Sequence, residues 1–157
     1  MLDEVLVGAI GSMLGICIHA AMTLAVIRFA RVLGQSMVRY PLLLIVVMIP
    51  TVTFLMGTHT LEVVVWAWLY KIVGAAPPGT PFVYFAFVNY TTLGYGDVVP
   101  LPQWQLLGPI TAMNGVLLFG WSTAVIFEIL RKTIELPPAQ ESAAARPSST
   151  ARRRLPT

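Results

Sequence analysis

Charged residues are scarce in this chain. Of its 157 residues, 11% are charged and 57% are hydrophobic, whereas ordinary globular proteins are about 25% charged. Seven acidic and ten basic side chains are too few to cover the water-facing surface of a soluble domain of this size. The single cysteine, Cys17, excludes an intramolecular disulfide. Because it lies in an apolar run, we interpret it as a small buried side chain.

The basic residues are gathered beside the apolar runs. The net charge of +3 alone would allow a nucleic-acid partner, but this distribution is typical of loops on the cytosolic side of a bilayer. We therefore expect a lipid bilayer as partner and no nucleic acid. The basic residues concerned are Arg28, Arg31, Arg39, Arg131, Lys132, Arg146, Arg152, Arg153 and Arg154.

Two long apolar runs open the chain. Val5 to Ala30 is long enough to cross a membrane, and acidic residues precede it, so we interpret residues 1–33 as a retained span and not as a signal peptide. Pro41 to Val73 is either one long helix or two short ones. With one helix, all ten basic residues except Lys71 lie on one side of the membrane. We therefore predict one helix, kinked near Pro50 or Gly57, with the N-terminus outside and the C-terminus inside.

A short helix and a last span follow. Ala75 to Pro81 holds three prolines and a glycine and predicts a turn. Phe82 to Thr92 predicts a helix too short to span, and Trp104 to Leu130 predicts the last span. Residues 133–157 are rich in Pro, Ala, Ser and Arg, and we expect a disordered basic cytosolic tail.

The informative motif is Thr91-Thr92-Leu93-Gly94-Tyr95-Gly96-Asp97. It resembles the selectivity filter of tetrameric potassium channels, in which loops from four subunits replace the hydration shell of the ion with backbone carbonyls. Pro41 to Leu130 follows that family's order of outer helix, pore helix, filter and inner helix. The resemblance implies an all-α membrane protein with three spanning helices and a re-entrant pore helix, and residues 40–132 form the pore domain.

The resemblance also implies roles for the filter residues. The carbonyls of Thr92, Leu93, Gly94 and Tyr95 would bind K⁺, and the Thr92 hydroxyl would add the innermost ligand. Gly94 and Gly96 permit the dihedral angles that point successive carbonyls the same way. The Leu93 and Tyr95 side chains would face the pore helix.

The supporting residues depart from the family pattern. Leu93 stands where valine is usual, and Tyr84 and Phe85 stand where many members have two tryptophans. Phe85 cannot donate a hydrogen bond to Tyr95, whereas Tyr84 can reach Asp97, which would lie behind the outer mouth. We therefore expect a less rigidly braced filter. Val88 and Thr91 complete the predicted support.

Polar and small residues in the last two spans give further candidates. Gly115 lies where inner helices often hinge, or else allows close helix packing. Asn114 either faces a water-filled cavity or bonds across helices, and Gly120 and Ser122 are candidates for the inner passage. His59 and Glu62, one helical turn apart, are either a pH-sensitive pair in the outer part of the helix or a mutually satisfied pair. We expect His19 to make a polar contact between spans.

Potassium-selective permeation is the function that the sequence favours. The resemblance implies a homotetramer in a bacterial cell membrane, with K⁺ as permeant ion and no cofactor. The alternatives are a weakly selective Na⁺/K⁺ channel and a non-conducting modulatory subunit. Gly120-Trp121-Ser122-Thr123 only loosely resembles an intramembrane protease motif and lacks its second glycine, so we expect no enzyme.

Overall fold

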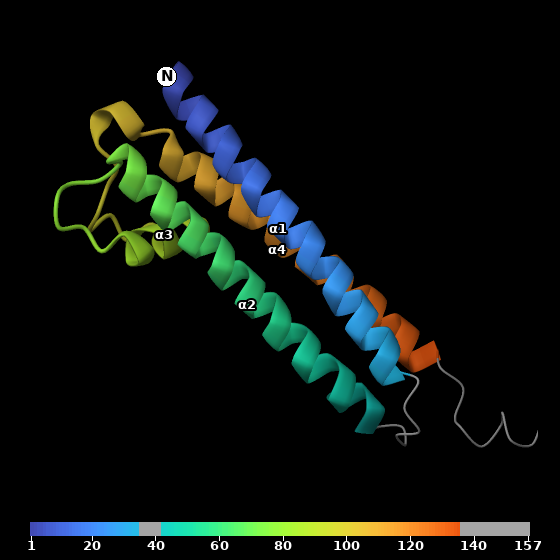
Figure 1. Cartoon of the computed structure of the whole chain (residues 1–157). Helices are drawn as coiled ribbons and strands as arrows, with labels where there is room; N and C mark the ends of the chain where they lie inside the picture. Colours follow the sequence, from blue (N-terminus) through green and yellow to red (C-terminus); the bar gives the residue numbers. More distant parts are fainter. Residues whose placement is uncertain (35–41, 136–157) are drawn as a thin grey trace, which may run out of the picture.

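The structure is a computed structural model that describes residues 1–34 and 42–135. In this part of the chain, helices α1 (Leu2–Gly34), α2 (Leu42–Val73) and α4 (Leu107–Glu135) are long and apolar enough to cross a membrane. They lie side by side, with α1 and α4 running in one direction and α2 in the other (Figure 1). The fold is all-helical, as the sequence predicts. Residues 136–157 of the expected tail and Arg39 lie outside the described residues, and residues 133–135 still belong to α4.

Pro41 to Val73 was the ambiguous run, and it forms the single helix α2 from Leu42 onward. Pro50 lies inside this helix. The helix ends at Val73, and the φ of 65° at the following Gly74 lets the Ala75 amide donate back to the Tyr70 carbonyl (2.9 Å). Such a C-terminal motif satisfies carbonyls that the helix itself leaves free. The chain then turns toward α3 (Phe82–Tyr90).

The short helix α3 (Phe82–Tyr90) packs against α2 and α4 at the end where α2 finishes (Figure 1). Its packing core is aromatic: Tyr70 is fully buried, with Phe85 and Trp66 at ring-centroid distances of 5.0 and 5.9 Å. The Tyr70 hydroxyl reaches Thr111 Oγ1 of α4 at 2.5 Å. The three elements around the motif are therefore joined by both apolar and polar contacts. A 3₁₀ turn, Pro102–Trp104, then leads into α4.

Helix α1 packs against both α2 and α4. Glycines allow this close approach. A Cβ at Gly11 would lie 2.7 Å from the Trp66 ring, and one at Gly15 would lie 3.1 Å from Asn114 Oδ1. Small residues at such spacing are typical of tightly packed membrane helices. The Glu4 side chain also accepts a hydrogen bond from the Leu106 amide (3.0 Å).

The other face of α1 carries Cys17, which is exposed. The expectation that Cys17 is buried was wrong, because the helix turns Gly15 and His19 inward and leaves Cys17 outside.

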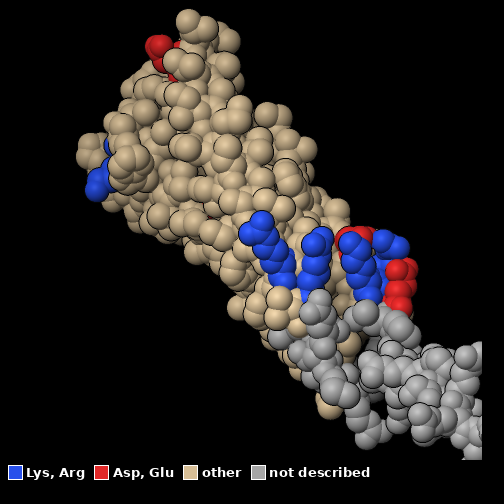
Figure 2. All heavy atoms as spheres, turned by 45° about the vertical axis from the view of Figure 1, so that its right-hand side comes forward, with Lys and Arg blue, Asp and Glu red and all other residues tan. Residues whose placement is uncertain are grey.

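Basic side chains form a band at the end of the bundle where α1 and α4 finish (Figure 2). Arg28 and Arg31 lie in the last turns of α1, and Arg131 and Lys132 lie in the last turns of α4. Glu128 pairs with Arg131 (2.9 Å) and Lys132 (2.8 Å). Acidic residues of the first turn of α1 lie at the opposite end. Charge is thus asymmetric along the bundle axis.

Candidate functional site

The loop that follows α3 has an alternating backbone. Thr92, Gly94 and Gly96 have φ values of 61°, 57° and 79°, and the residues between them do not have positive φ. Glycine adopts this left-handed region without steric cost, which fits the roles expected of Gly94 and Gly96. Thr92 is β-branched, and for such a residue this conformation is an outlier that the sequence did not indicate. Left-handed φ values at every second position agree with the backbone expected of Gly94 and Gly96 in a loop whose carbonyls point the same way.

The end of α3 holds the start of this loop. The Val88 carbonyl accepts from the Leu93 amide (2.9 Å) and the Gly94 amide (3.4 Å). The Thr91 hydroxyl donates to the Phe87 carbonyl (2.7 Å), and the Val88 side chain is buried. The helix end therefore fixes the backbone from Thr91 to Gly94 directly.

The loop is also tied at its far end. Tyr84 donates to Asp97 Oδ2 at 2.7 Å, the hydrogen bond that the sequence allowed. This hydrogen bond to the carboxylate raises the pKa of Tyr84. Phe85 is enclosed against Tyr70, so within the chain its aromatic contact is with the core and not with Tyr95.

One face of the loop is open. Leu93 is 53% exposed and Tyr95 is 67% exposed. The packing against a pore helix that we expected for these side chains is therefore not completed within one chain. A loop whose carbonyl-bearing backbone and flanking side chains are uncovered is suited to contacts with other copies.

Two of the α4 candidates pack tightly. Asn114 is 3% exposed and accepts a hydrogen bond from Trp66 Nε1 (3.3 Å). Of the two alternatives for Asn114, a cavity-facing residue or a hydrogen bond across helices, the structure has the second. At Gly115, an added Cβ would collide with the Tyr90 carbonyl, whereas at Gly120 it would meet nothing within 4 Å. Gly115 thus allows the end of α3 to touch α4, and Gly120 leaves an open surface.

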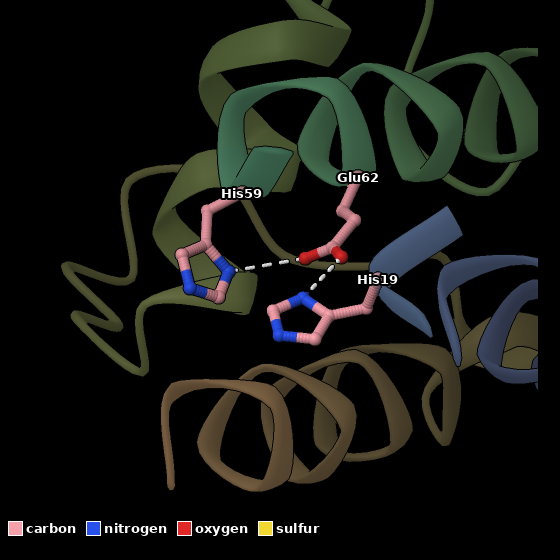
Figure 3. Close-up of side chains that lie close together, drawn as sticks. All are labelled: His19, His59 and Glu62. Atoms are coloured by element: carbon pink, nitrogen blue, oxygen red, sulfur yellow. Dashed lines mark hydrogen bonds and ion pairs between the residues drawn. The ribbon is translucent and has the colours of Figure 1, made fainter. Parts of the chain in front are cut away.

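A polar cluster lies between the helices (Figure 3). Glu62 has its Oε1 2.8 Å from His19 Nδ1 and its Oε2 3.1 Å from His59 Nδ1. Tyr90, the last residue of α3, donates to Glu62 Oε2. Ser122 Oγ of α4 lies 2.9 Å from His59 Nε2 and 3.3 Å from His19 Nε2. The cluster therefore joins all four α-helices.

Only part of this cluster was visible in the sequence. The spacing of His59 and Glu62 indicated a pair, but placed it in the outer part of the helix. His19 and Ser122 lie near the midpoints of α1 and α4, so the cluster lies near the middle of the bundle. His19 does make a contact between spans. Tyr90 and Ser122 were missed as members, because the register between helices is not encoded in any local pattern.

Comparison with known proteins agrees with this architecture. Residues 58–132 match a protein-family model described as "Ion channel". The matched segment takes in the second half of α2, all of α3, the loop and nearly all of α4, and it leaves α1 outside. Searches of curated proteins and of solved structures gave no match. The match supports an ion channel family for this multi-pass helical membrane protein.

Proposed function

We propose that the chain is one subunit of a potassium-selective channel in which four identical copies surround a central axis. The carbonyls of Thr92, Leu93, Gly94 and Tyr95 replace the hydration shell of K⁺ as it passes. The alternating φ values of Thr92, Gly94 and Gly96 carry this proposal. Position 93 contributes its backbone carbonyl and not its side chain, so the substitution of leucine for valine there leaves the ligands unchanged.

The open face of the loop supports the assembly. A single loop contacts an ion from one side only, and the exposed Leu93 and Tyr95 leave apolar surface for a neighbouring copy to cover. Tetramer formation would then complete the packing around the filter that one chain lacks.

The charge asymmetry supports an orientation. Basic residues favour the cytosolic side, so the band in Figure 2 would face the cytosol of a bacterial cell. The N-terminus and the filter would then lie toward the outside. Permeation is passive and follows the electrochemical gradient.

The test is a recording of the purified full chain in a planar bilayer with K⁺ on one side and Na⁺ on the other. We expect a reversal potential far from zero, with the K⁺ side negative, because K⁺ leaves that side and Na⁺ does not enter. A reversal potential near zero would instead support weakly selective conduction. The absence of current, with current on co-expression with another channel, would support the modulatory subunit.

A further inference from the structure

We propose that His19, His59, Glu62 and Tyr90 form a metal-ion site that takes a divalent first-row transition metal, with Zn²⁺ as the best fit. The proposal does not depend on ion conduction. His19 of α1 and His59 and Glu62 of α2 point toward one another inside the bundle (Figure 3). Tyr90 of α3 contacts the same group.

The donor set fits a tetrahedral site. One ligand atom from each of His19, His59 and Glu62 lies within 4.8 Å of the others. The Tyr90 hydroxyl donates a hydrogen bond to Glu62, and its oxygen lies 3.0 Å from His59 Nδ1. This oxygen is therefore placed to be the fourth metal ligand. Zinc binds imidazole nitrogen and carboxylate oxygen at about 2.0–2.2 Å, which small side-chain rotations would provide. Two imidazoles favour zinc-like ions, whereas Mg²⁺ and Ca²⁺ prefer all-oxygen sites.

Ser122 fits the role of an outer partner. Metal-binding histidines nearly always donate their second ring N–H to a fixed acceptor. Both Nε2 atoms lie near the same Ser122 Oγ, whose two lone pairs can accept from both. That arrangement leaves both Nδ1 lone pairs directed at the carboxylate, where a metal ion would lie.

Hydrogen-bond counting shows why a cation suits this place. Six contacts link the members of the cluster: three to Glu62, two to Ser122 and one between Tyr90 and His59. With Glu62 ionised and both rings neutral, the tyrosine, the serine and the two rings supply four protons. The four protons are fewer than the six contacts, and the cluster carries a net negative charge in an apolar bundle, where an uncompensated charge is costly. A divalent ion bound by both Nδ1 atoms, Glu62 and Tyr90 takes the place of the Nδ1 protons. The site is neutral if the Tyr90 hydroxyl gives up its proton to solvent on binding, because the two positive charges of the ion then balance the carboxylate and the phenolate.

Metal binding would connect α1 to α2 and α3. His19 belongs to α1, Glu62 and His59 to α2, and Tyr90 to the end of α3. An ion held by all three would fasten α1 to the residue that directly precedes the filter motif.

The experiment uses the full chain in lipid nanodiscs, stripped of metal with a chelator and titrated with Co²⁺. Tetrahedral Co²⁺ with nitrogen and oxygen ligands gives a strong visible absorption band. We expect this band at one ion per chain, with Zn²⁺ displacing it. X-ray absorption of the Zn²⁺ form should show only nitrogen and oxygen neighbours at about 2.0–2.2 Å.

Variants identify the ligands. His19→Gln and Glu62→Gln should remove the band, and Ser122→Ala should weaken binding by about 10- to 100-fold. Cys17→Ser removes an exposed potential ligand on α1 and Glu128→Gln removes an exposed carboxylate, so both should bind like wild type. Circular dichroism and gel filtration establish that each variant is folded. Binding retained in folded His19→Gln, binding lost in Cys17→Ser, or a wild-type cluster that takes up only protons and no metal would each overturn the proposal.

Discussion

The loop after α3 (Thr91 to Asp97), which we propose as the filter, and the polar cluster meet at Tyr90. They differ in how much of their packing one chain completes. The loop exposes Leu93 and Tyr95. In the cluster, Glu62 and His19 are fully buried, and their polar atoms have partners within the chain. The difference indicates that one chain completes the packing of the cluster but not that of the loop, which in the proposed assembly other copies would cover.

The largest effect should come from breaking the cluster. Glu62→Gln removes the charge that three donors share, and removing one partner from a buried charged network costs about 3–5 kcal/mol. For a chain of this size that corresponds to a fall in melting temperature of roughly 6–20 °C. The measurement is thermal unfolding of the full chain in detergent.

Glu128→Gln is the matched control, because Glu128 pairs with Arg131 and Lys132 at an exposed position. Exposed pairs add little stability, so this variant should melt close to wild type. Equal melting temperatures for the two variants would contradict the view that the cluster stabilises the subunit.

The second effect concerns the contact between the two regions. Gly115→Ala places a methyl group against the Tyr90 carbonyl, a backbone atom that has little freedom to move. Overpacking of this kind costs about 1–3 kcal/mol. Because Tyr90 directly precedes the motif, we expect lower stability together with altered ion selectivity in bilayer recordings.

Gly120→Ala serves as the control for this substitution, since its methyl group would enter open space. A hinge at Gly115 without a packing role predicts a changed open probability and an unchanged melting temperature. That combination would show that the close contact is unimportant.

The third prediction tests the loop by itself. Gly94→Ala forces an L-residue into a φ of 57°, which costs about 1–2 kcal/mol. On the scale used above this cost lowers the melting temperature of the monomer by at most about 2–8 °C, and by less where the exposed loop relaxes. We expect lower K⁺ selectivity, measured from the reversal potential, and a lower yield of tetramer, measured by mass photometry. A strong fall in the melting temperature of the monomer with unchanged selectivity would show instead that the loop stabilises the single subunit.

Sequence patterns predicted the helices well because each has its own local signal. The apolar runs, the Pro/Gly turn before Phe82 and the glycines of the motif gave the three spans, the short helix and the flexible positions of the loop. What the patterns missed is the register between helices. Nothing local to His19 or Ser122 says that they share partners with Glu62, and nothing local to Gly115 says that it faces Tyr90. Thr92 was missed because propensity argues against its conformation, which the hydrogen bonds to the end of α3 impose.

The smallest effect should come from the tie between α3 and the far end of the loop. Tyr84→Phe removes the hydrogen bond to Asp97 at an exposed position, so we expect faster loss of current during a voltage step and little change in melting temperature. The bond raises the pKa of Tyr84, so its contribution is present below the ordinary tyrosine pKa of about 10 and is lost as the pH rises through the higher value in the folded protein. Wild type and Tyr84→Phe should therefore differ at neutral pH and converge in strongly alkaline solution on the side of the filter. A difference that persists unchanged at alkaline pH would show that ring packing, and not the hydrogen bond, braces the loop.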